Sequence, residues 1–275
     1  MDKNNGDFIF IGSINPNMLV TNDDVYLVSI IIKHLAITLE KTILHEELKR
    51  AYEENKKELL MARKIQQSLI PKSFPLFAAL NMRGLYMPMD ALGEDLYDVY
   101  KISDTKLGVV ILDVCGHGVP AALITTMAKI SFNNYSKDNL STAQILENVN
   151  RELQDIMGSV GESDYFTAFY CIIDSINKTI QYTNAGHNDI FIVRNKSNIL
   201  KLKVNSSFVG LMKGIKFLSD SVKLLDGDRI ILYTDGIVEA KDNENNLYGE
   251  KRFLNLILKN SELPVDRLIN EISDD

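Results

Sequence analysis

Three aspartates of this 275-residue chain could together bind a metal ion. They are Asp95, Asp113 and Asp235. Asp113 ends the apolar run Val109–Leu112 and Asp235 ends the run Arg229–Thr234, so each is predicted to leave a buried strand at a glycine-containing corner. A carboxylate there is costly unless hydrogen bonds or a cation take up its charge.

Carboxylates with no His or Cys cluster nearby in sequence suit a hard divalent cation, Mg²⁺ or Mn²⁺, better than structural zinc. Such sites commonly hold two ions and activate a water for attack on phosphorus. The alternative is that each Asp-Gly pair is only a turn. That alternative is favoured for any one pair, but it is weakened by two strand-end corners and the Gly93-Glu94-Asp95 element together.

A hairpin is predicted to bring two of the acids together. The strands Val99–Ile102 and Leu107–Leu112 flank the short turn Ser103–Thr105, so Asp95 and Asp113 are expected near the same sheet edge. A helix follows Gly118, with proline in its first turn, where a missing N–H costs nothing.

Further elements are expected along the chain. A helix is predicted at Ser141–Met157, capped by Ser141 or Thr142. Strands are predicted at Phe8–Ser13, Asn81–Met87, Tyr165–Ile173, Thr179–Thr183 and Asp189–Val193. His187 lies in the turn Asn184–Asn188, where a structural hydrogen-bonding role is favoured over a ligand role.

A long helix is predicted from Thr21 to Leu69, ended by Pro71. Its apolar residues recur at spacings of four and three, as in Val28, Ile32, Leu35 and Leu39, which is typical of a packing seam. A parallel homodimer through this helix is favoured over a solitary helix folded back on its own domain.

Composition and charge argue against several classes of protein. A net charge of −7 without a basic stripe argues against a nucleic-acid partner. Cys115 and Cys171 are not spaced as a metal or redox motif and are expected to be small, buried, reduced thiols. No transmembrane segment or signal peptide is evident, so a cytoplasmic protein without a membrane partner is expected.

Five motifs in one order carry a family resemblance. They read GEDLYD, DVCGHGVPAA, YFTAFY, TNAGHND and LYTDGIVEA. The region from about Ala62 to Gly249 resembles the bacterial SpoIIE-type (RsbU-like) branch of the metal-dependent PPM (PP2C-like) protein serine/threonine phosphatases. The resemblance implies an α+β fold, an α-β-β-α sandwich of two antiparallel sheets flanked by helices and preceded here by a long N-terminal helix.

The resemblance also implies a site. Asp113 would bridge two Mn²⁺ or Mg²⁺ ions, and Asp95, Asp235 and the carbonyl of Val114 would complete their ligands. A metal-activated water would be the nucleophile, so no side chain acts as one. The implied substrate is a phosphoserine or phosphothreonine on a regulatory protein, a STAS-type anti-sigma-factor antagonist.

Two departures from the family pattern leave an alternative open. Glu94 replaces a usual glycine and is a possible accessory ligand, and Ser273-Asp274-Asp275 stands where the family continues to a strand starting Asp-Asp-x-Thr. A missing last strand is expected, with Asp274 and Asp275 ending an unrelated helix. The alternative function is a catalytically weak or inactive regulatory module of the same fold.

Three segments are therefore expected. Residues 1–45 resemble the C-terminal remnant of a GAF-like sensor domain. Residues 46–70 form a signalling, coiled-coil helix, and residues 71–275 form the PP2C-like domain.

Overall fold

The computed structural model describes residues 21–77, 80–88, 92–157, 165–203 and 205–275. The chain divides into two units, residues 1–58 and 59–275, and each is described here by itself. The strand predicted at Phe8–Ser13 and the first 20 residues of the GAF-like segment lie outside the described residues.

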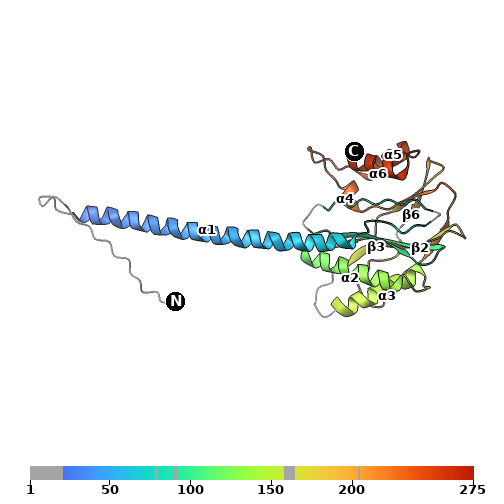
Figure 1. Cartoon of the computed structure of the whole chain (residues 1–275), viewed down its shortest axis with the longest axis horizontal. Coiled ribbons are helices and arrows are strands. Elements are labelled where there is room, and N and C mark those ends of the chain that lie inside the picture. Colours follow the sequence, from blue (N-terminus) through green and yellow to red (C-terminus); the bar gives the residue numbers. More distant parts are fainter. Residues whose placement is uncertain (1–20, 78–79, 89–91, 158–164, 204) are drawn as a thin grey trace. The chain divides into compact units, whose positions relative to one another are not determined.

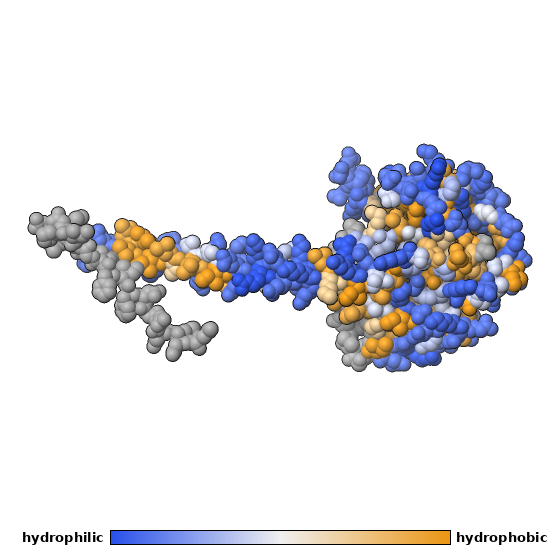
Figure 2. Space-filling model, viewed as in Figure 1, coloured by the Kyte–Doolittle hydropathy of each residue, from blue (hydrophilic) through white to orange (hydrophobic). Residues whose placement is uncertain are grey.

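The long helix is confirmed as α1, Asn22–Leu69. Its start is a capping box: the Asp24 N–H donates to Thr21 Oγ1 (3.3 Å), and the Thr21 N–H donates to the Asp24 carboxylate (2.9 Å). Apolar side chains cover the first part of the helix and hydrophilic ones its middle (Figure 2). The predicted seam residues Leu35 and Leu39 are 64% and 63% exposed, so the single chain leaves this seam open to solvent.

The second unit contains two antiparallel sheets, as the resemblance implied. The five-stranded sheet has the order β1-β2-β3-β4-β7 and the three-stranded sheet the order β6-β5-β8. The strands are β1 (Asp95–Lys101), β2 (Lys106–Val114), β3 (Phe166–Asp174), β4 (Thr179–Ala185), β5 (Ile190–Arg194), β6 (Asn198–Leu202), β7 (Asp220–Lys223) and β8 (Arg229–Ile231). The helices of this unit beyond α1 are α2 (Val119–Tyr135), α3 (Thr142–Met157), α4 (Asp235–Val238), α5 (Glu250–Lys259) and α6 (Val265–Asp274).

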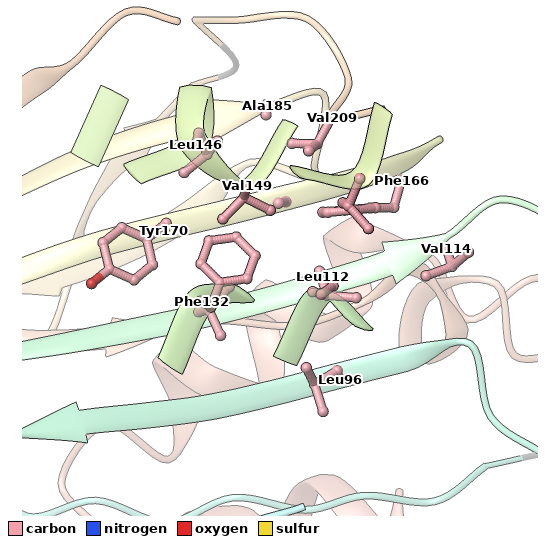
Figure 3. Packing of buried hydrophobic residues seen from close by; sticks show 14 of the residues in the cluster. Leu96, Leu112, Val114, Phe132, Leu146, Val149, Phe166, Tyr170, Ala185 and Val209 are labelled. Atoms are coloured by element: carbon pink, nitrogen blue, oxygen red, sulfur yellow. The ribbon is translucent and has the colours of Figure 1, made fainter. Parts of the chain in front are cut away.

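Helices α2 and α3 cover the outer face of the five-stranded sheet (Figure 1). The ring of Phe132 on α2 stacks on Tyr170 of β3 with 5.5 Å between centroids, and both are fully buried (Figure 3). Ser141 caps α3, because the Gln144 N–H donates to its Oγ and the Gln144 side chain accepts the Ser141 N–H.

Two more apolar layers complete the sandwich. Phe169 and Ile173 of β3 meet Ile190 and Ile192 of β5 between the sheets. On the outer face of the smaller sheet, a cluster joins Phe191, Val193, Tyr233, Phe253 and Ile257, the last two from α5. The α-β-β-α arrangement is therefore confirmed.

Some expectations were wrong. No strand occurs in described residues 80–88, so the strand predicted at Asn81–Met87 is absent there: this segment joins neither sheet. Cys171 is buried as expected, but Cys115 is exposed because it follows the last residue of β2. Among the described helices, none combines the length and the apolar character needed to cross a membrane.

Candidate metal site

The predicted hairpin is present and sets two carboxylates directly opposite each other. Asp95 of β1 pairs in register with Asp113 of β2. The Val114 N–H donates to the Glu94 carbonyl (3.2 Å), so the neighbouring Asp95–Asp113 position is a non-hydrogen-bonded pair. Side chains approach most closely at such a pair, and like charges directly opposite one another are destabilising.

The electrostatics of the pair follow from this placement. Burial raises the pKa of Asp113 to about 7, and the negative charges of Asp95, Asp235, Glu94 and Glu239 add to that rise. Asp113 therefore interacts with the three other acids that the sequence selected, Asp95, Asp235 and Glu94, and with Glu239, which it did not select.

The pKa of Asp95 is raised for similar reasons. Burial raises its pKa to about 6, the hydrogen bond from Thr234 opposes the rise, and the charges of Asp235 and Glu94 add to it. Its Oδ2 accepts the Thr234 hydroxyl at 3.0 Å, whereas its buried Oδ1 has no hydrogen-bond partner among the described residues. A buried oxygen of this kind needs a donor or a cation.

These residues fit a hard divalent cation. The donor set is oxygen only, two carboxylates face each other, and one buried carboxylate oxygen is unpartnered. Within the described residues, no three acidic, His or Cys side chains already converge as a complete metal cage.

Asp235 reaches the site by a different route from the one predicted. Strand β8 ends at Ile231, and Asp235 is the first residue of α4, with Thr234 as its N-cap residue. The preceding strand is thus only three residues long, and no glycine corner ends it. Thr234 connects the two acids, since its hydroxyl bonds Asp95 while its backbone leads into Asp235.

The corner after Asp113 does depend on glycine. Gly116 and Gly118 have φ angles of +110° and +78°, a region that other residues rarely adopt. Val114, whose carbonyl is the implied ligand, is buried at the end of β2 immediately before this corner. Helix α2 then begins at Val119 with Pro120 in its first turn, as expected.

The loop that carries Asp95 is held by contacts the sequence argument did not name. The Gln66 side chain pairs with the Gly93 backbone, donating to its carbonyl (2.5 Å) and accepting its N–H (2.8 Å). The Thr125 hydroxyl donates to the Glu94 carbonyl at 3.2 Å. The segment MARKIQQSLIPKSFP, which resembles the helix introducing such domains, was the available signal for Gln66.

The chain's final acids have other partners. The Tyr248 hydroxyl donates to the Asp275 carboxylate (2.6 Å), and Arg252 Nε donates to it at 3.1 Å. Asp274 is the last residue of α6. These contacts join α6 to α5, which agrees with the expectation that Asp274 and Asp275 end a helix.

Comparison with known proteins decides the family. The profile of the Stage II sporulation protein E (SpoIIE) family matches residues 103–275, more than half of the chain. The chain belongs to the SpoIIE family. It is 31% identical to phosphoserine phosphatase RsbP of Bacillus subtilis over 67% of this chain and 46% of RsbP, so it spans less than half of that relative's length.

Solved structures show the same fold. The SiaA-PP2C domain of Pseudomonas aeruginosa matches with a TM-score of 0.69 and 18% identity, over 82% of this chain and 89% of that one. RsbX in complex with magnesium matches with a TM-score of 0.50 and 16% identity, over 66% and 80% of the two chains. At these identities the likeness establishes the fold alone.

Proposed function

We propose that this chain is a Mn²⁺- or Mg²⁺-dependent protein serine/threonine phosphatase. The observation that carries the proposal is the Asp95–Asp113 pair, two half-buried carboxylates opposed in register with one buried oxygen unpartnered among the described residues. Membership of the SpoIIE family and the similarity to a phosphoserine phosphatase support the same activity.

Asp113, Asp95, Asp235 and the Val114 carbonyl would hold two ions, with Glu94 as an accessory group. When bound, such ions would neutralise the carboxylates, polarise the phosphoryl group and supply an activated water. Magnesium in the related RsbX structure supports this choice of metal.

The chain's own residues orient this set. Thr234 donates to Asp95 Oδ2, which would leave the unpartnered Oδ1 for a metal ion. Gln66 and Thr125 fix the backbone on which Asp95 is carried. The positive φ angles of Gly116 and Gly118 turn the chain just after Val114.

For the partner, the family resemblance supports a phosphorylated STAS-type antagonist of an anti-sigma factor. The exposed seam of α1 supports a homodimer through this helix, with residues 1–45 and 46–70 as sensor remnant and signalling helix. The alternative, a regulatory module with weak or no activity, predicts metal binding without turnover.

A phosphatase assay on the full chain tests the activity. Hydrolysis of a phosphoserine peptide is expected with Mn²⁺ and not with EDTA, and Asp113→Asn is expected to abolish it. Asp174→Asn is the matched control, because Asp174 is at the opposite end of β3 from Thr167, the partner of Asp113. Manganese-dependent turnover that survives Asp113→Asn would refute the assignment.

A further inference from the structure

His187 is a buried residue that the proposed chemistry does not use. Its side chain lies in the turn after β4 and is 2% exposed. The conformation of this turn depends on two of its residues: Asn184 Oδ1 accepts the His187 N–H (2.9 Å), and Gly186 has a φ of +71°. A Cβ at Gly186 would also collide with the Phe208 ring.

Both ring nitrogens of His187 are engaged. Nε2 lies 3.1 Å from the carbonyl oxygen of Tyr233, and Nδ1 lies 2.8 Å from Thr167 Oγ1. A carbonyl only accepts, so Nε2 must carry the proton. Nδ1 is then an acceptor, and the Thr167 hydroxyl donates to it at 2.8 Å in preference to the Asp113 carbonyl, which lies 3.4 Å away. Burial lowers the pKa of His187 to about 4, which keeps the ring neutral in this tautomer near neutral pH.

One partner lies on β3 of the five-stranded sheet, the other follows the last strand of the three-stranded sheet, and both adjoin the carboxylates. Thr167 lies on β3 and is the register partner of Asp113 in the five-stranded sheet. Tyr233 follows β8 of the three-stranded sheet. The next two residues are Thr234, whose hydroxyl bonds Asp95, and Asp235. His187 therefore connects the strand beside Asp113 to the segment that delivers Asp235.

We propose that His187 is a positioning residue for the metal site, a neutral bridge between Thr167 and Tyr233 that holds Asp235 at a fixed separation from the Asp95–Asp113 pair. The inference rests on the proposed function and deepens it. Groups that orient ligands in this way commonly change metal affinity by about 10–100-fold when removed.

Two variants break the bridge at its Thr167 end. His187→Gln keeps a donor for the Tyr233 carbonyl but loses the acceptor for Thr167, and Thr167→Val removes the other partner with little change in shape. Calorimetric titration of the metal-free full chain with Mn²⁺ is expected to show affinity lowered about tenfold in each. The double variant is expected to be no weaker than either, because both changes break one connection. His45→Gln, on an exposed position of α1, is the control and is expected to bind like the wild type.

NMR of the metal-free protein provides an independent reading. The His187 ring is expected as the Nε2–H tautomer, with an N–H proton that persists in the wild type and in Thr167→Val. Unchanged Mn²⁺ affinity in a folded Thr167→Val variant, or an Nδ1–H tautomer, would overturn the inference while leaving the phosphatase assignment standing. A wild-type chain that binds no Mn²⁺ would instead refute the proposed function itself.

Discussion

Removing the negative charge of Asp113 should stabilise the metal-free protein. In the fold Asp113 faces Asp95, and burial together with the surrounding acids raises its pKa from 3.8 to about 7. At 1.36 kcal/mol per pH unit, this corresponds to about 4 kcal/mol of unfavourable free energy above neutral pH. Asp113 is only partly buried, so solvent screening reduces the figure, and we expect Asp113→Asn to gain about 1–2 kcal/mol.

The pH dependence follows from the sign of the shift. A carboxylate with a raised pKa binds more protons in the folded than in the unfolded protein between about pH 4 and pH 7. The free energy of unfolding of the wild type therefore falls as pH rises through this window. The advantage of Asp113→Asn should be small at pH 4 and reach its full value above pH 7.

Urea unfolding in EDTA at pH 4, 5.5 and 7.5 measures this directly. Saturating Mn²⁺ should reverse the ranking, because a cation at about 100 times its Kd stabilises the wild type by about 2.7 kcal/mol and the variant would lack the proposed bridging ligand. Asp174→Asn is the control: hydrogen bonds from Asn177 and Ile176 lower the pKa of Asp174, so its loss should not stabilise. An Asp113→Asn protein that is less stable than the wild type in EDTA at pH 7.5 would refute the reasoning.

Three further predictions concern other contacts. Gln66→Ala should lower the free energy of unfolding by about 1–2 kcal/mol in urea titrations, because it leaves the Gly93 N–H and carbonyl without their partner; no loss would mean that water replaces the amide. Phe132→Ala should cost about 3–5 kcal/mol by the same measurement, since it empties a fully buried site against Tyr170, and a loss below 1 kcal/mol would contradict that packing. Leu35→Glu with Leu39→Glu should convert a dimer to a monomer in light scattering, with Lys41→Glu as the exposed control, and a wild-type monomer would contradict the α1 dimer.

The sequence was sufficient where one local rule governed the outcome. Thr21 with Asp24 and Pro71 set the ends of α1, and the short turn between β1 and β2 determined that Asp95 meets Asp113. It failed where tertiary pairing decides. The apolar run before Asp235 could pair with β5 over only three residues, so the strand stops at Ile231. The segment that contains Asn81 has a strand-like composition, but it pairs with none of the described strands of either sheet.

The candidate site also contains residues that the sequence predicted and residues that it did not. Its carboxylates were predictable because charge at the end of an apolar run is unusual in any fold. Gln66, Thr125 and the His187 connections were not, because each bonds a backbone or hydroxyl group 20 to 46 positions away. Such contacts leave no local pattern. The turn sequence did predict a structural hydrogen-bonding role for His187, which is confirmed, but not its partners Thr167 and Tyr233.

The hydrogen bonds of the loop before Asp95 determine which of its side chains can change. The hydrogen bonds that hold this loop include four to main-chain atoms: the Gln66 side chain bonds both Gly93 backbone groups, and the Glu94 carbonyl accepts from the Thr125 hydroxyl and the Val114 N–H. A Cβ at position 93 would collide with the Tyr86 hydroxyl, so a larger residue there requires the Tyr86 side chain to move. Position 94 can exchange glycine for glutamate without losing any of these bonds. A change of residue at position 94 can therefore alter the charge beside Asp95 while these four backbone hydrogen bonds keep the loop in place.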